Sequence, residues 1–229
     1  MNTGCGTVSL SKVIEIARGE LGVCESPAGS NRVKYWELFG PGWQGQPWCV
    51  AAQWWWFWKA GESSAFFGGA KTASCGKLLR FYKENYQSVP VREISVGDLG
   101  FFNFSGGVVP EHCGLVTHVE RSHGSILYIK SIEGNTYAEG GSGDDSNGGC
   151  VAERVRYPRN IVGVARPKYK PEEPEEIADD VTGHWAEADI RWAKEKGLMT
   201  GYPDGSWKPD QPVTRAELAA VLHRNDKEG

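Results

Sequence analysis

Apolar residues recur at helical spacing in the first third of the chain, so three helices are expected there. The segment 11–22 reads SKVIEIARGELG, and Ser11 is placed to cap its start. A tryptophan-rich helix is predicted from about Pro47 to Gly61, and a third helix over residues 74–85. The tryptophans of the second helix cannot all share one face at roughly 100° per residue, so some of them must lie in the core.

After residue 90 the pattern changes to short β-rich runs separated by glycine-rich or polar turns. Helices followed by an antiparallel meander predict an α+β fold for this part of the chain. The insert AEGGSGDDSNGG at 138–149 is predicted to be a flexible loop between two strands. The predicted strands lie at residues 97–104, 112–120, 125–134, 150–157 and 162–167.

A proline- and glutamate-rich stretch divides the chain into two parts. Residues 167–178 read PKYKPEEPEEIA, with three prolines and four glutamates, which predicts a stiff, extended linker between domains 1–166 and 179–229. The second part follows the pattern helix, turn-rich loop, helix. It is therefore expected to be a small all-α unit whose thin core needs a partner surface.

The composition narrows the class of protein. The chain has 229 residues, 40% of them hydrophobic, which is enough to build a core. It contains no run of 18 apolar residues, so no membrane span is expected. A net charge of −4 argues against nucleic acid as the main partner. The charge is uneven: residues 1–170 carry +3 and residues 171–229 carry −7, which fits two units with different tasks.

The six cysteines show no spacing typical of a metal site. There is no CxxC pair and no zinc-like ligand cluster, so neither a metal nor a cofactor is predicted. The N-terminus lacks the basic start and apolar stretch of a secretory signal. Free thiols without a disulfide are therefore the expectation. The cysteines are Cys5, Cys24, Cys49, Cys75, Cys113 and Cys150.

One cysteine has the position of a nucleophile. Cys49 stands at the expected start of the tryptophan-rich helix, where the helix dipole lowers a thiol pKa and favours the thiolate. A thiolate nucleophile needs a base. His112 and His118 are near-equal candidates, predicted on one face of the same strand. The next strand ends in SIEGNT, where Glu133 and Asn135 share a face, and either could accept from an imidazole N–H.

The ordered motifs PWC, GDLGFF, HCGLV and IEGNT resemble the CHAP family, the cysteine, histidine-dependent amidohydrolases/peptidases. The segment LGVCESPAGSNRVKYW also resembles the stretch before the nucleophile in one CHAP subgroup, and the similarity spans about residues 11–166. The resemblance implies a papain-like fold with Cys49 as nucleophile and His112 as base. It implies Glu133 as the third member of the centre, with Asn135 as a supporting polar group.

This resemblance implies hydrolysis of amide bonds in peptidoglycan. N-acetylmuramoyl-L-alanine amidase activity is expected first, and a peptide endopeptidase of the same mechanism is the alternative. The oxyanion of the reaction is expected to bind the backbone N–H of Cys49 and one side-chain donor. Tyr35, Gln44 and Gln46 remain open as that donor.

The segment before the nucleophile carries two further expectations. Some CHAP enzymes have an Asp-rich calcium loop there, but GPGWQGQPWC contains no carboxylate, so no calcium site is expected. Trp43 and Trp48 flank this glycine-rich loop and are candidates for stacking on glycan or peptide in the cleft.

In the second part, the residues DV–HWA, GLMTGYPDGSWKPD and VTRAEL resemble an S-layer homology repeat. That family anchors proteins to secondary cell-wall polysaccharide through three repeats around a pseudo-threefold axis. Trp185, Gly201 and Arg215 fall on its motif positions, and Arg215 could pair with an anionic sugar substituent. This chain carries a single copy. Either three chains associate into a homotrimer, or the single repeat binds weakly or only acts as a scaffold.

Together the two resemblances predict a modular peptidoglycan hydrolase of the phage endolysin type. Without a recognisable signal, it is expected to be made in the host cytoplasm and to act on the bacterial cell wall after release. The rival hypothesis is a non-catalytic wall-binding protein in which the Cys49 centre is degenerate. The expected partners are peptidoglycan and secondary cell-wall polysaccharide, with no nucleic acid and no membrane.

Overall fold

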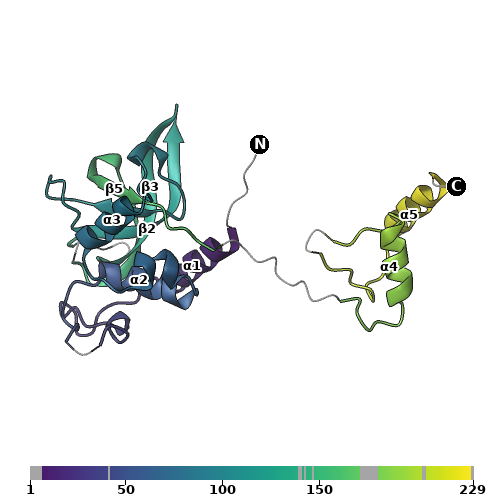
Figure 1. Cartoon of the computed structure of the whole chain (residues 1–229), viewed down its shortest axis with the longest axis horizontal. Helices are drawn as coiled ribbons and strands as arrows, with labels where there is room; N and C mark the ends of the chain where they lie inside the picture. The colour runs from purple at the N-terminus through teal and green to yellow at the C-terminus, as the bar shows by residue number, and fades with distance from the viewer. Residues whose placement is uncertain are drawn as a thin grey trace. The chain divides into compact units, whose positions relative to one another are not determined.

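The computed structural model describes residues 7–40, 42–138, 141, 143–145, 147–170, 180–202 and 205–227. The chain divides into two compact units, Met1–Pro171 and Glu172–Gly229. The first unit holds a sheet with the helices α1, α2 and α3, and the second holds α4 and α5 (Figure 1). Among the described residues, no helix is long and apolar enough to span a membrane.

Three helices form where helical periodicity predicts them. They are α1 (Thr7–Gly19), α2 (Cys49–Lys59) and α3 (Cys75–Glu84). α1 begins four residues before Ser11, so the predicted cap was wrong and Ser11 lies inside the helix. The helix extends backwards because Leu10 continues its apolar stripe and packs so closely on Gly97 that a Cβ there would lie 2.6 Å from its Cδ1.

The β-rich runs form one antiparallel five-stranded sheet in the order β4-β3-β2-β1-β5. The meander prediction holds from β1 to β4, and β5 returns to pair with β1 at the far edge. The α+β class is therefore confirmed. The strands are β1 (Leu99–Phe102), β2 (His112–Ser122), β3 (Ser125–Thr136), β4 (Cys150–Arg156) and β5 (Ile161–Ala165). Short 3-10 turns lie at Lys34–Trp36, Ser63–Ala65, Phe67–Gly69, Val91–Glu93 and Pro158–Asn160.

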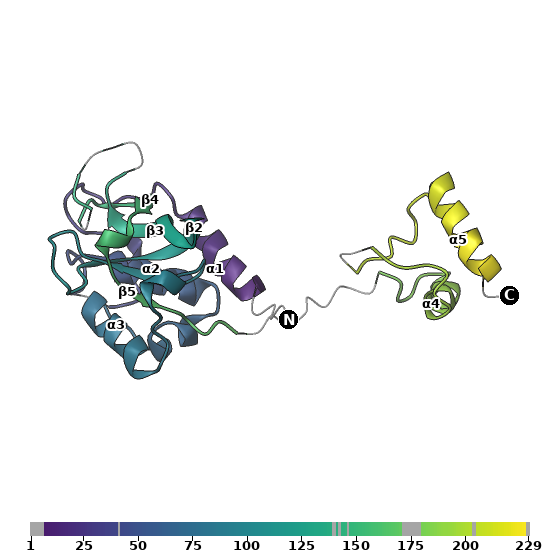
Figure 2. The same ribbon diagram turned by 90° about the horizontal axis from the view of Figure 1, so that it is seen from above.

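Helix α2 packs against β2 and β3 and sets the position of the first unit's core (Figure 2). Trp54 and Trp56 are buried, whereas Trp58 is largely exposed, as the helical geometry requires. The start of α2 lies very close to β3. A Cβ on Gly134 would lie 2.5 Å from the Cβ of Ala52, so only glycine allows this approach. The N-terminus of α2 is thereby held at the end of the sheet.

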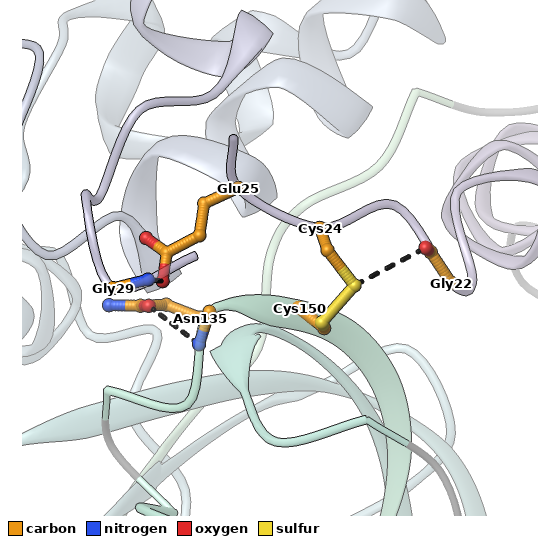
Figure 3. Close-up of a disulfide and its surroundings, with 7 residues drawn as sticks. Gly22, Cys24, Glu25, Gly29, Asn135 and Cys150 are labelled. Atoms are coloured by element: carbon orange, nitrogen blue, oxygen red, sulfur yellow. Dashed lines mark hydrogen bonds between the residues drawn. A yellow bond between two sulfur atoms is a disulfide. The ribbon is translucent and has the colours of Figure 1, made fainter. Parts of the chain in front are cut away.

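A disulfide joins Cys24 to Cys150, so the expectation of free thiols throughout was wrong (Figure 3). The two cysteines are 126 residues apart, and no local spacing reveals the pair. They meet because the segment after α1 runs antiparallel to the start of β4: Glu25 N–H donates to Gly149 O at 2.8 Å, and Val151 N–H donates to Val23 O at 2.8 Å. The disulfide therefore ties the N-terminal helix segment to the edge of the sheet.

The first unit extends further than the expected boundary at residue 166. The Tyr169 hydroxyl donates to Gly97 O at 2.6 Å, and its ring stacks on Phe57 with centroids 5.6 Å apart. Lys170 N–H donates to the Glu62 carboxylate at 3.1 Å. The start of the predicted linker is therefore packed on the first unit. Residues 171–178 of that linker lie outside the described residues.

The second unit contains two helices, α4 (Glu187–Glu195) and α5 (Arg215–Lys227), joined by a turn-rich loop (Figure 2). A capping box starts α5: Thr214 N–H donates to the Glu217 carboxylate at 2.7 Å, and Glu217 N–H donates to Thr214 Oγ1 at 3.2 Å. The core of this unit is thin. Among the described residues of this unit, the buried hydrophobic ones are Val181, Ala193 and Leu198.

Candidate active site

Three residues of the predicted centre meet at the start of α2. Cys49 is the first residue of α2, His112 the first residue of β2, and Glu133 lies in β3. His112 Nε2 lies 3.0 Å from Glu133 Oε2, and both side chains are fully buried. The Cys49 thiol interacts with the same imidazole. The structure therefore brings a thiol, an imidazole and a carboxylate together in that order.

The second imidazole nitrogen is left for the thiol, because Glu133 occupies Nε2. His112 Nδ1 is buried and makes no well-aligned hydrogen bond to any described residue. Catalytic hydrogen bonds are often long or poorly aligned before substrate binds, and they tighten in the reacting complex.

The electrostatics favour a thiolate–imidazolium pair. Interactions with Cys113, Cys75 and His112 outweigh burial and hold the pKa of Cys49 well below its usual range. Burial alone would lower the pKa of His112, but Cys49 and Glu133 outweigh it and raise that pKa to about 9. Both shifts favour an anionic sulfur beside a cationic imidazole, which is the state in which a cysteine thiol is most reactive.

Arg156 holds Glu133 in its ionised form. Arg156 Nε and Nη2 donate to the two Glu133 carboxylate oxygens at 2.9 and 2.6 Å, and Ser131 Oγ donates at 2.6 Å. Burial would raise the pKa of Glu133, but Arg156 and His112 outweigh it and lower that pKa. Arg156 Nη1 also donates to Asp145 at 2.5 Å. The sequence analysis did not single out Arg156. The available signal was an arginine on the predicted strand that follows the strand of Glu133.

A glycine in the HCGLV motif makes room for this arrangement. A Cβ on Gly114 would lie 2.6 Å from Glu133 Cγ and 3.0 Å from Ser131 Cβ. Gly114 and Glu133 are on the same face of the sheet, so the carboxylate reaches His112 across the space that a side chain would fill. The glycine therefore has a packing role in the centre.

His118 does not lie on the face of His112, so that prediction was wrong. The pairing register shifts between Val116 and His118, because β2 carries an extra residue there. The shift turns His118 to the opposite face of the sheet, where it is exposed and lies 3.1 Å from Glu120. This leaves His112 as the histidine of the centre.

Asn135 does not share a face with Glu133, contrary to the prediction. It has a positive φ of 60°, and the register of β3 against β4 shifts between Glu133 and Thr136. Its side-chain amide donates to Asn147 at 2.9 Å. Its side-chain oxygen accepts from Gly149 N–H at 3.2 Å (Figure 3). In the described contacts Asn135 therefore holds the end of the 138–149 loop, and it has none to His112.

Two further cysteines surround the nucleophile. The Sγ atoms of Cys49, Cys75 and Cys113 all lie within 4.8 Å of one another, and the three residues are buried. The sulfurs of Cys49 and Cys75 are 3.7 Å apart. The sequence showed no ligand-like spacing because the three come from α2, α3 and β2. Only the fold brings them together.

A pocket of about 560 Å³ opens beside the centre. Its lining includes Gln46 and Pro47, which precede the nucleophile, and Ser74, which precedes Cys75. Trp43 also lines it, as expected of a cleft residue, but Trp48 does not: it is fully buried, with its ring 5.4 Å from that of Tyr35. The lining of the pocket does not include Cys49, His112 or Glu133 themselves.

The three side-chain candidates for the oxyanion site have different surroundings. The Tyr35 hydroxyl donates to Glu20 at 2.6 Å in the buried interior. The Gln44 amide exchanges hydrogen bonds with the backbone of Val33 at 3.1 and 3.2 Å. Gln46 is exposed and lines the pocket. Gln46 is thus the candidate placed where a substrate carbonyl could reach it.

The predicted glycan-binding residues of the second unit do not meet in one pocket. Gly201 lines a pocket of about 520 Å³ between the turn-rich loop and α5, together with Trp207 and Arg224. Trp185 is 87% exposed and packs against the ring of His184. Arg215 is exposed at the first position of α5. Of the three, Gly201 alone is in the pocket lining, where a Cβ would lie 2.8 Å from Ser206 O.

Residues 179–219 match the S-layer homology domain family. The similar curated proteins include cell surface glycoprotein 1 of Acetivibrio thermocellus, 56% identical over 39 residues that make up 17% of this chain and 2% of the relative. A cellulosome-anchoring protein of the same organism is 46% identical over 41 residues, or 18% of this chain and 9% of the relative.

S-layer protein EA1 of Bacillus anthracis is 42% identical over 44 residues, or 19% of this chain and 5% of the relative. The chain thus spans a small fraction of the curated relatives that it matches. No solved structure matches it. The similarity to these relatives is confined to a segment of the chain, so the interpretation of the first unit rests on its own residues.

Proposed function

We propose that this chain is a cell-wall-targeted protein whose second unit binds wall polysaccharide and whose first unit hydrolyses amide bonds of peptidoglycan. The binding half is supported by the S-layer homology match at residues 179–219 and by similarity to S-layer and anchoring proteins. The catalytic half rests on one observation, the Cys49–His112–Glu133 arrangement at the start of α2.

The proposed reaction is acyl transfer through a thioester. The Cys49 thiolate attacks the amide carbonyl carbon, and His112 donates its proton to the departing amine as the C–N bond breaks. Water then attacks the thioester carbonyl while neutral His112 accepts its proton, which releases the acid and restores the thiolate–imidazolium pair. Glu133 keeps the imidazole oriented, and Arg156 keeps Glu133 ionised.

The oxyanion would be stabilised at the start of α2. There the backbone N–H of Cys49 belongs to the first turn and has no helical partner. Gln46 is the proposed side-chain donor, because it lines the pocket while Tyr35 and Gln44 are bonded elsewhere. A nucleophile at a helix start, with its base on an antiparallel sheet, is also the arrangement that the papain-like CHAP resemblance implies.

The proposed bond is the one between N-acetylmuramic acid and L-alanine, and a peptide-bridge endopeptidase is the alternative. The Cys24–Cys150 disulfide supports a location outside the reducing cytoplasm, and the cell wall is such a location. The phage-type origin and the release at lysis stay predictions of the resemblance.

A second candidate function is wall binding without catalysis. The comparisons favour it, since the relatives are S-layer, cell-surface and anchoring proteins. The burial of Cys49, which is only 3% exposed, also favours it. The linked buried charges of His112, Glu133 and Arg156 favour catalysis instead. A core that served packing alone would have no need of three such charges.

The enzymatic half is tested with Cys49→Ala in the full chain. Turbidity loss of purified bacterial walls should fall at least 1000-fold, in the range seen when a nucleophile is removed. His118→Ala is the matched control, since it changes a histidine of the same strand on the opposite face. Equal clearing by wild type and Cys49→Ala would exclude the hydrolase. Mass spectrometry of the digest then separates cut muramoyl–alanine bonds from cut peptides.

The binding half is tested by sedimentation with purified walls before and after extraction of their secondary polysaccharide. Intact walls should pull down the chain and extracted walls should not. Arg215→Ala should weaken binding, whereas Arg159→Ala, a surface change in the first unit, should leave it unchanged. Equal binding to both wall preparations would contradict recognition of the polysaccharide.

A further inference from the structure

Three thiols lie together in the buried interior, and the proposed reaction does not need all of them. Cys49, Cys75 and Cys113 place their Sγ atoms within 4.8 Å of one another, although the proposed reaction needs only Cys49. They come from the first residue of α2, the first residue of α3 and the second residue of β2. Three convergent sulfurs from separate elements form a preorganised set of soft ligands.

The spacing of the sulfurs fits a metal ion. A tetrahedral zinc site with Zn–S bonds of about 2.3 Å has neighbouring sulfurs roughly 3.8 Å apart. Cys49 and Cys75 are 3.7 Å apart, so a cation could bridge these two with little movement. The Sγ atom of Cys113 lies within 4.8 Å of the other two Sγ atoms, so the three sulfurs form a triangle. The three sulfurs already surround one common position.

The surroundings compensate for negative charge on the sulfurs. Cys49 and Cys75 each begin a helix of ten or more residues, and a helix N-terminus carries a partial positive charge. The nearby carboxylate of Glu133 is already paired with Arg156. Three thiolates and one divalent cation carry a net charge of −1. The partial positive charges of the two helix N-termini compensate for this charge.

A nitrogen ligand is available at the same place. His112 Nδ1 is fully buried and makes no well-aligned hydrogen bond to any described residue, and the imidazole interacts with the Cys49 thiol. Its other nitrogen is held by Glu133 at 3.0 Å, as carboxylates commonly hold metal-bound histidines. His112, or a water from the adjoining pocket, would provide the fourth ligand.

We propose that Cys49, Cys75 and Cys113 form a binding site for a thiophilic d10 cation such as Zn²⁺, and that occupancy withholds Cys49 from hydrolysis. Binding forms three S–Zn bonds and releases to solvent the protons held by the thiols and, where His112 is the fourth ligand, by its imidazole, with no electron transfer. The inhibitory half rests on the function proposed above. The binding half stands on the cluster geometry alone.

The test uses the full chain, reduced and freed of metal, with Cd²⁺ as the spectroscopic probe and Zn²⁺ as the competitor. Cd²⁺ should produce thiolate-to-metal charge-transfer absorption that saturates at one ion per chain, and Zn²⁺ should remove it. In wild type, bound Zn²⁺ should slow alkylation of the three clustered cysteines at least tenfold, as peptide mass spectrometry reports. Absent absorption, or alkylation unchanged by Zn²⁺, would overturn the site.

Variants assign the ligands. Cys75→Ser and Cys113→Ser should each weaken Zn²⁺ binding at least tenfold against a chromophoric chelator, with circular dichroism confirming that each variant is folded. The matched control is the double variant Cys24→Ser and Cys150→Ser, which also removes two sulfurs but leaves the cluster intact. Full binding by both cluster variants, or loss of binding in the control alone, would contradict the assignment.

Activity separates this inference from the proposed function. Zn²⁺ should lower wall clearing at least tenfold at saturation, and a chelator should restore it. Clearing unaffected by a bound ion would refute the inhibitory half. An inactive metal-free chain that still binds one Cd²⁺ would refute the hydrolase while supporting the site.

Discussion

At the scale of single residues, a row of buried charges is the main feature of the first unit. The imidazole of His112 lies between the Cys49 thiol, with which it interacts, and the Glu133 carboxylate, which in turn accepts from the Arg156 guanidinium. Each member is stabilised as a charge only because its neighbour carries the opposite one. A substitution of Arg156 should therefore alter the ionisation of Cys49 at the other end of the row.

Arg156→Met tests this dependence. The substitution leaves the buried Glu133 carboxylate without its guanidinium partner, and removing one partner of a buried ion pair costs about 3–5 kcal/mol. The free energy of unfolding, measured with urea, should fall by that amount. Arg154→Met changes an arginine two residues away on the same strand, half-buried and packed on Tyr137, and should cost less. Equal losses of unfolding free energy in the two variants would mean that the Arg156–Glu133 ion pair stabilises the fold no more than the Arg154 contacts do.

The raised pKa of His112 predicts a pH dependence. Its pKa is about 9 in the folded chain and about 6.5 when unfolded. Because the folded pKa is the higher one, the stabilisation is complete below about pH 6.5 and is lost as the pH rises through 9. The kcat/KM for wall hydrolysis should show its alkaline limb near pH 9.

Nuclear magnetic resonance of the His112 ring should show the same titration, and Glu133→Gln should move its midpoint downward because a carboxylate contribution is lost. A ring that titrates near pH 6.5 in wild type would contradict the ion pair.

At the scale of elements, the disulfide joins two parts of the chain that contact each other mainly through the backbone. It connects the segment after α1 to the start of β4 and closes a loop of 126 residues. A crosslink across a long loop restricts the unfolded chain and stabilises the folded one by about 2–5 kcal/mol.

Replacing both Cys24 and Cys150 with serine should lower the free energy of unfolding by this amount and lower the melting temperature. Wild type under a strong reductant is the control and should reproduce the loss. Unchanged stability in both would show that the bridge is not formed in solution.

The sequence predicted the elements well because their periodicity is local. The helices α2 and α3 and all five strands lie within a few residues of their expected positions. The site was harder to predict, since it depends on departures from periodicity. A register shift in β2 turns His118 away, and the positive φ of Asn135 breaks the alternation after Glu133.

The contacts that join distant segments left no local pattern at all. Cys24 meets Cys150, and Cys75 meets Cys49, because of how the helices pack on the sheet. Arg156 in β4 reaches Glu133 in the neighbouring strand β3. Sequence spacing reports neighbours along one element, whereas these pairs are neighbours only through tertiary structure.

At the scale of the whole molecule, the two units differ in how much of their apolar surface is covered. The first unit encloses a large aromatic core. In the second unit, the apolar stripe that Leu218 and Leu222 form on α5 is exposed: Leu218 is 48% and Leu222 is 60% exposed, and Val213 before the helix is also exposed. Exposed apolar stripes on a small unit typically mark an interaction surface.

We expect this stripe to associate with a second copy of the chain, as the single S-layer homology repeat predicts. Light scattering of the full chain should give a mass that rises with concentration towards a trimer. Leu218→Glu combined with Leu222→Glu places charges on the stripe and should return the chain to a monomer, because burying unpaired carboxylates is costly. Val108→Glu, which changes an 85% exposed valine in the first unit, should leave the association unchanged. A chain that stays monomeric at all concentrations and still sediments with purified walls would show that one repeat suffices for binding.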